Sequence, residues 1–200
     1  VSNFDTSQVK DMHAMFCGVS NLESLDVTHF NTSKVTNMNS MFRGMKKIKN
    51  LNLTHFDTSN VTDMGGMLSF LDEIESLDLK NFNTSKVEKM SSMFAGDKKI
   101  TELDLSSFNT KEVTTMGGWY DDISETTIGK HMDEGMFDGM INLKNIKFGN
   151  NFDTSKVTNM SAMFRECKNL ISLDLSKFDT SNVTNMDLMF DETNLDTLNI

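Results

Sequence analysis

Hydrophobic and polar positions follow one pattern that returns along the whole chain. The stretch FNTSKVTNMNSMF at residues 30–42 shows the pattern, and related stretches begin at Phe4, Phe56, Phe82, Phe108, Phe152 and Phe178. The spacing is 26 residues except for one step of 44, between Phe108 and Phe152. A fixed period of about 20 to 50 residues is typical of stacked repeat proteins, whose units bury their apolar faces against their neighbours. The pattern therefore predicts one elongated repeat domain over residues 1–200.

The first half of each repeat predicts a short strand. Leu25 and Val27 alternate with the polar Asp26, as expected for a strand with one buried face. The equivalent apolar pairs are Leu51 and Leu53, Leu77 and Leu79, Leu103 and Leu105, Ile146 and Phe148, Leu173 and Leu175, and Leu198 and Ile200. When the repeats stack, these segments should form a narrow parallel sheet.

The second half of each repeat predicts a short helix. Val35, Met38, Met41 and Phe42 have the spacing of one helical face, and the polar run at 31–33 offers candidate N-caps. Helix propensity is poor in this run, so packing of the Met and Phe face would have to hold the helix. The predicted fold is α/β. It is a right-handed solenoid of the leucine-rich-repeat type, with seven 26-residue coils, a narrow parallel sheet on one face and short helices on the other.

Charge and composition exclude several classes of function. The net charge is −10 and there is no basic patch, which argues against nucleic-acid binding. No run of 18 apolar residues is present, so no membrane insertion is expected. Both ends read as parts of a repeat, and we expect the chain to be a fragment of a longer array.

Candidate catalytic and metal-binding motifs are weak. Cys17 and Cys167 lie several repeats apart, too far for a disulfide, and are expected to be free thiols. His13 with Cys17, or His29 with His55, would supply two ligands where zinc needs three or four. No phosphate-binding loop or nucleophile motif is present. We therefore predict no enzyme activity, no metal and no cofactor.

A column of mostly acidic residues occupies the outward strand position. Its members are Asp26, Asn52, Asp78, Asp104, Lys147, Asp174 and Asn199. Stacked acids repel one another, so a cation or a basic partner could bind there. Two interpretations remain open: a solvated face that keeps the protein soluble, and a ligand-binding face that includes Asp78, Asp104 and Lys147.

One insertion, at about residues 119–135, interrupts the repeat. Trp119 and Tyr120 are the only Trp and Tyr, and they stand where other repeats carry Met-Phe. The spacing from Met136-Phe137 to Leu143 predicts that this later pair fills the core position. Trp119, Tyr120, Asp121 and Asp122 would then be candidate ligand-binding residues, together with Asp104 and Lys147. Alternatively, Trp119-Tyr120 replaces Met-Phe in the core and the insertion has no role.

The sequence of residues 152–186 reads FDTSKVTNMSAMFRECKNLISLDLSKFDTSNVTNM. It closely resembles the BspA-like leucine-rich-repeat surface proteins of bacteria. The resemblance covers nearly the whole chain apart from the insertion. It implies an extracellular protein, secreted or on the bacterial cell surface, and a non-catalytic adhesin fragment that binds host proteins such as fibronectin or fibrinogen. The alternative function is a structural spacer or stalk that holds another domain away from the cell.

Overall fold

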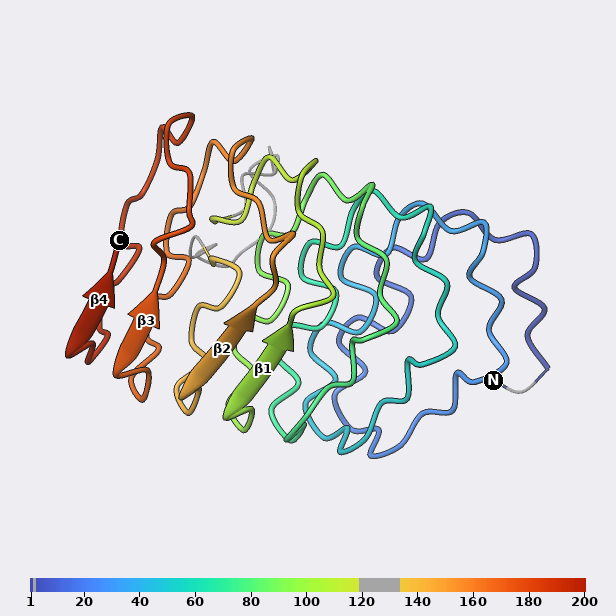
Figure 1. Ribbon diagram of the computed structural model, residues 1–200. Helices are drawn as coiled ribbons and strands as arrows, with labels where there is room; N and C mark the ends of the chain where they lie inside the picture. The colour runs from blue at the N-terminus through green and yellow to red at the C-terminus, as the bar shows by residue number, and fades with distance from the viewer. Residues whose placement is uncertain (2, 119–133) are drawn as a thin grey trace, which may run out of the picture.

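The computed structural model describes residues 1, 3–118 and 134–200. Successive repeats form loops of chain that stack side by side (Figure 1), and we call each loop a layer. Four layers contain a short strand: β1 (Glu102–Leu105), β2 (Asn145–Phe148), β3 (Ser172–Asp174) and β4 (Thr197–Asn199). β1 pairs in parallel with β2, and β3 pairs in parallel with β4. Within the described residues there is no helix, and so none that could cross a membrane.

The predicted helices do not form. Ser40, in the middle of the predicted helical segment, has a φ of 54°, whereas a right-handed helix needs about −63°. The N–H groups of Met38 and Ser40 donate to carbonyl oxygens of Asp63 and Gly65 in the next layer, at 3.0 and 2.8 Å. A chain of tight turns bonded to its neighbour thus replaces the helix. The predicted α/β, right-handed, leucine-rich-repeat-type solenoid of seven coils with helices on one face is therefore wrong.

One ladder of backbone contacts connects the layers on the side where helices were predicted. Isolated parallel bridges join consecutive members of the series Asp11, Asn37, Asp63, Lys89, Thr115, Asn159 and Asn185. We call this series the bridge ladder. Its continuity explains the loss of the helices, because each backbone N–H that donates to the next layer is withdrawn from a helical hydrogen bond.

The side chains of the repeated Asn/Asp-Thr-Ser motif form hydrogen bonds within and between layers and do not cap helices. The Thr32 hydroxyl donates to the carbonyl oxygen of Asp57 (3.0 Å) and accepts the Asp57 N–H (2.8 Å). Asp57 Oδ1 in turn accepts the Ser59 N–H at 3.0 Å, in an Asx turn. Buried threonines make the same contacts in other layers, so the prediction of N-caps is corrected.

The core consists of columns of Met, Phe, Val and Leu side chains. Phe137 stacks between Phe94 and Phe164, with ring centroids 6.0 and 5.4 Å away, and Phe164 stacks on Phe190. Met136 and Phe137 are fully buried. The prediction that Met136-Phe137 fills the core position after the insertion is therefore confirmed.

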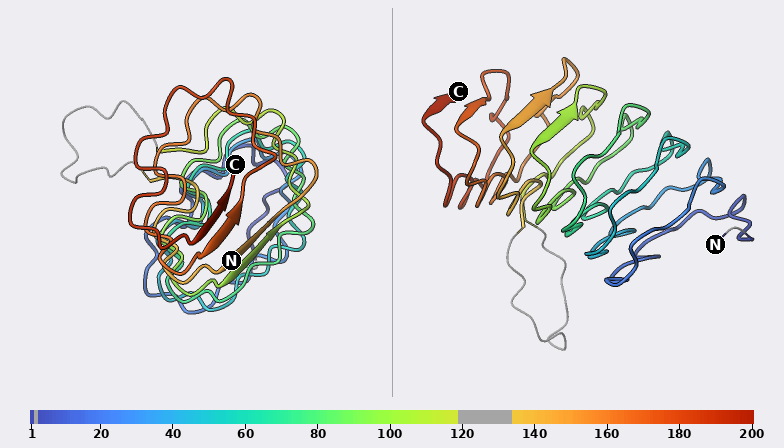
Figure 2. Two further views of the ribbon diagram at one scale, coloured as in Figure 1. Left: turned by 60° about the vertical axis from the view of Figure 1, so that its left-hand side comes forward. Right: turned by 90° about the horizontal axis from the view of Figure 1, so that it is seen from below.

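The predicted sheet is interrupted. Among the described residues, strands pair only within β1–β2 and β3–β4, and the layers before β1 share one bridge on this side, Ser24 with Asn50. Figure 2 shows the layers fanned farther apart on the side of the strands than on the opposite side. The continuous bridge ladder joins the layers on the opposite side, so the break in backbone pairing is confined to the strand side of the described layers.

Candidate functional site

The outward strand column is largely a set of turn acceptors. Oδ1 of Asp78 accepts the N–H of Lys80 at 3.3 Å, and Oδ1 of Asp104 accepts the N–H of Ser106 at 2.9 Å. Asp26, Asn52 and Asp174 accept the N–H two residues later in the same way. Asn serves this purpose as well as Asp, because only the side-chain oxygen is needed. The repeat therefore maintains this column for local backbone structure.

Asp104 and Lys147 lie opposite each other on β1 and β2. Lys147 Nζ is 3.2 Å from Asp104 Oδ2, and both side chains are exposed. Hydrogen bonds from Ser106, and then the contact with Lys147, lower the pKa of Asp104 to about 2. The structure thus brings together two of the predicted site residues, while Asp78 belongs to an earlier layer.

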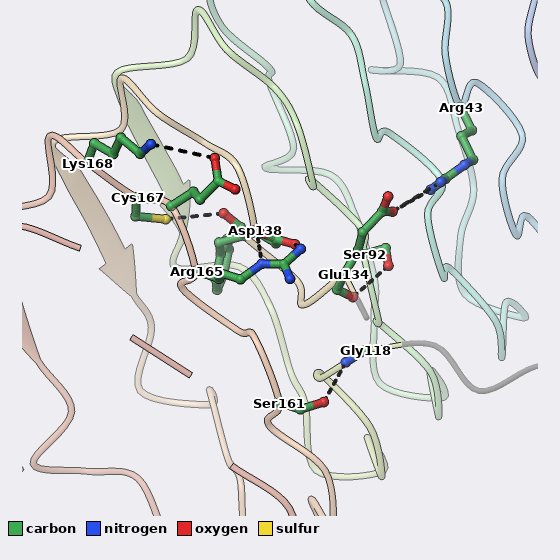
Figure 3. Close-up of polar contacts among 11 residues, drawn as sticks. Arg43, Ser92, Gly118, Glu134, Asp138, Ser161, Arg165, Cys167 and Lys168 are labelled. Carbon is green, nitrogen blue, oxygen red and sulfur yellow. Dashed lines mark hydrogen bonds and ion pairs between the residues drawn. The ribbon is translucent and has the colours of Figure 1, made fainter. Parts of the chain in front are cut away.

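The predicted residues Trp119, Tyr120, Asp121 and Asp122 lie outside the described residues. The described flanks of the insertion are joined, since the Met136 N–H donates to the Met116 carbonyl oxygen at 2.8 Å. Glu134 makes a salt bridge with Arg43 at 3.0 Å, and its carbonyl oxygen accepts the Ser92 hydroxyl at 2.7 Å (Figure 3). The repeat pattern does not predict this contact, because Arg43 and Glu134 are 91 residues apart in the chain.

A buried ion pair lies near this point. Arg165 Nη2 is 2.5 Å from Asp138 Oδ2, and the two side chains are only 12% and 5% exposed (Figure 3). Burial raises the pKa of Asp138 to about 6, although Arg165 opposes the shift. Both Asp138 oxygens bond to Arg165. The ion pair therefore joins two neighbouring layers through both carboxylate oxygens.

The two cysteines are free, as predicted. Cys17 is exposed, whereas Cys167 is buried and its thiol lies 3.2 Å from the Phe137 carbonyl oxygen (Figure 3). Burial, together with the charge of Asp138, raises the pKa of Cys167 to about 12. A thiol with so high a pKa is unreactive at neutral pH.

Asp97 is a carboxyl group inside the core. It is fully buried, Oδ1 accepts the Leu71 N–H at 2.8 Å, and Oδ2 has no partner among the described residues. Burial, and to a lesser degree the charge of Asp72, raises the pKa of Asp97 well above its usual 3.8. The position corresponds to Leu71 and Met140 in neighbouring layers, which the sequence pattern marks as apolar.

We expect Asp97 to make the stability of the protein depend on pH. Because its pKa is raised in the folded state, folding takes up a proton above about pH 4, and the protein loses stability as the pH rises. Asp97→Asn keeps an acceptor for Leu71 but cannot ionise. Urea melts should therefore show that the advantage of Asp97→Asn over the parent grows between pH 4 and pH 7. A constant difference would show that Asp97 does not titrate in this range.

A groove of about 430 Å³ opens on the strand side between β2 and β3. The two strands are neighbours in the stack, yet each pairs only with its outer partner, β1 or β4. The edges of β2 and β3 that face each other therefore leave backbone groups without a strand partner. The break in pairing opens the groove at the surface, although the two strands remain too close for a further strand to fit between them.

Aromatic side chains line the inner part of the groove. Phe148 lies 4.5 Å from Phe152 and 5.3 Å from Phe178, measured between ring centroids. Phe148 and Phe178 are only partly buried. All three rings line the groove, so it offers an apolar surface below its polar rim.

Three lysines, Lys144, Lys147 and Lys177, line the groove, and Asp174 is the only acidic residue among the lining residues. The lysines are exposed. The Asp174 carboxylate is already bonded to the Ser176 N–H and to Asn199 Nδ2. The groove is therefore positive on a chain with a net charge of −10.

The groove coincides with departures from the repeat. Lys147 stands where the other repeats carry the Asp or Asn that accepts a turn hydrogen bond. Phe148 stands where they carry the smaller Leu, Val or Ile. Phe148 and Phe152 lie four residues apart, where Leu105 and Phe108 lie three apart. The additional residue packs closely, since a Cβ on Gly149 would lie 2.3 Å from the Ser106 carbonyl oxygen. Sequence reasoning selected Lys147 but missed Lys144, Phe148 and Lys177, although the four-residue spacing was visible.

Within the described ranges, no group of three or more His, Cys, Asp or Glu side chains is placed to hold a metal ion. His29 and His55 instead lie beside Thr28 and Thr54, 3.4 and 3.2 Å from the hydroxyl oxygens. The arrangement that remains as a candidate site is the groove, which is suited to binding.

Comparison with known proteins identifies one family model. It matches residues 1–73, 46–128 and 130–199, and its description reads "Mycoplasma protein of unknown function, DUF285". The three matches together span most of the chain, which is consistent with a repeat-containing protein. No curated protein and no solved structure matches the chain.

Proposed function

The chain belongs to the DUF285 family, and we propose that it is a non-catalytic protein-interaction module of a bacterial surface protein. The groove between β2 and β3 is the observation that carries this proposal, because it combines an apolar interior, a charged rim and unpaired strand edges. These are features of surfaces that bind extended protein segments. The BspA-like resemblance of the sequence, and the extracellular location that it implies, belong to the same proposal.

A structural spacer is the second candidate function. The bridge ladder favours it, since an unbroken series of contacts from Asp11 to Asn185 makes a regular stack that can extend by adding layers. A spacer function, however, does not require a groove with aromatic and positively charged lining at one irregular repeat. Binding therefore explains the structure better than spacing alone.

A biosensor screen tests the proposal. Residues 1–200 are immobilised, and fibronectin, fibrinogen and other matrix and plasma proteins are passed over them. We expect saturable binding of at least one of these proteins, and no binding to the same chain after denaturation. If every candidate gives the signal of the denatured control, the adhesin function is contradicted and the spacer is favoured.

A further inference from the structure

We infer that the groove between β2 and β3 binds an extended acidic peptide segment, in which carboxylates flank an apolar side chain. The inference rests on the proposed binding function and specifies which surface binds and what chemistry it recognises. Its basis is the coincidence, in one place, of an interrupted sheet, an aromatic interior and a cationic rim.

The shape of the groove favours an extended ligand. Residues 144–149 line one wall, and residues 172–174 and 176–178 line the other, so the groove follows the direction of the strands. At about 3.3 Å per residue, the six residues of the first wall span about 20 Å, which accommodates about six residues of extended chain. β2 and β3 still approach each other closely, so the segment lies over the groove and is not inserted between the two strands as a further strand.

The interior of the groove favours an apolar side chain at the centre of the segment. Phe148 is half-buried, in contact with Phe152 and Phe178, and it stands where most repeats carry Leu. Covering the exposed part of this aromatic surface removes it from water, which contributes about 25 cal/mol per Å² of apolar area. A polar residue at this position of the ligand would lose that contribution.

The rim of the groove favours acidic flanking residues. Lys147 pairs with Asp104 at 3.2 Å, and Lys177 Nζ lies 3.5 Å from Asn150 Oδ1. Lys144 has no ion pair with any described residue. Among the described residues, Lys144 and Lys177 therefore form no ion pair, and carboxylates of a ligand can pair with them.

The test uses a defined probe. A fluorescein-labelled heptapeptide of the composition Glu-Val-Asp-Leu-Glu-Val-Asp is titrated with the protein and followed by anisotropy, beside the uncharged peptide Gln-Val-Asn-Leu-Gln-Val-Asn. We expect the acidic peptide to bind at least about tenfold more tightly, because each exposed pair contributes up to about 1 kcal/mol and about 1.4 kcal/mol is tenfold. The preference should decrease with added salt, since screening acts over about 8 Å at physiological ionic strength.

Two variants locate the site. Lys144→Glu with Lys177→Glu should lower the affinity for the acidic peptide by about tenfold or more, by the same arithmetic. The matched control reverses two lysines on another part of the surface, Lys34 and Lys86, which bond to Gln8 and Asn60. Lys34→Glu with Lys86→Glu changes the net charge by the same amount and should leave the affinity unchanged. Both variants should melt like the parent, because all four lysines are exposed.

Three results would overturn the inference: equal affinity for the two peptides, equal losses in the two double variants, or no binding of the acidic peptide by a folded parent. These results are distinct from failure of the proposed function. A matrix or plasma protein whose binding does not respond to Lys144→Glu with Lys177→Glu would support the binding function while contradicting the groove as its site.

Discussion

Replacing Phe137 with Ala is expected to lower the free energy of unfolding by about 3–5 kcal/mol, the usual cost of a large void in a packed core. Phe137 is fully buried, its ring stacks between Phe94 and Phe164, and Phe148 meets it edge-on at 6.4 Å. Layers held by the bridge ladder cannot close the void without breaking backbone hydrogen bonds. Denaturant melts measure the loss.

The control for this prediction is Phe4→Ala, at a phenylalanine whose surface is 54% exposed. We expect this change to cost less than about 1 kcal/mol, because little apolar surface is returned to water. Similar losses for the two variants would show that the ring of Phe137 does not occupy the core after the insertion.

The second large effect is expected at the buried ion pair. Arg165→Met should cost about 3–5 kcal/mol, because it leaves the Asp138 carboxylate buried without its cation. The cost should be largest above about pH 6, where Asp138 is ionised in the parent, and smaller below it, where protonation removes the unpaired charge. Chemical denaturation at several pH values checks both statements.

A surface pair serves as the control. Lys156 and Glu112 are 2.6 Å apart, but their side chains are 48% and 43% exposed. Lys156→Met should therefore change the free energy of unfolding by no more than about 1 kcal/mol. Adding Asp138→Asn to Arg165→Met should recover part of the loss and remove its pH dependence. A pH-independent loss in Arg165→Met alone would mean that packing, and not charge, explains the effect.

The error about helices has a clear physical origin. Met38, Met41 and Phe42 are buried together, as the periodic pattern indicated, but several backbones can bury the same side chains. The pattern shows which side chains face the core and does not show where the backbone N–H groups donate. The low helix propensity of the Thr, Asn and Ser residues was the signal against a helix, because interlayer hydrogen bonds compete with helical ones.

Only some residues of the candidate site could be predicted from the sequence. Lys147 was selected with Asp104 because both lie on the strand face of the repeat that carries the insertion, and Lys147 lines the groove. The acidic column was considered as a binding face, yet Asp78 and Asp104 accept backbone N–H groups of their own turns. Lys144 and Lys177 lie in different repeats, and their shared groove depends on a break in strand pairing.

The sequence by itself determined the period, the residues that face the core, the return of Met136-Phe137 to the core position and the separation of the two cysteines. These properties follow from the spacing of apolar residues along the chain, which tertiary contacts do not alter. Only the tertiary structure decided that the layers are joined by the bridge ladder, that no described segment is a helix, and that the sheet opens between β2 and β3. Those outcomes depend on competition for backbone hydrogen bonds between neighbouring layers, and no single repeat contains both partners of such a bond.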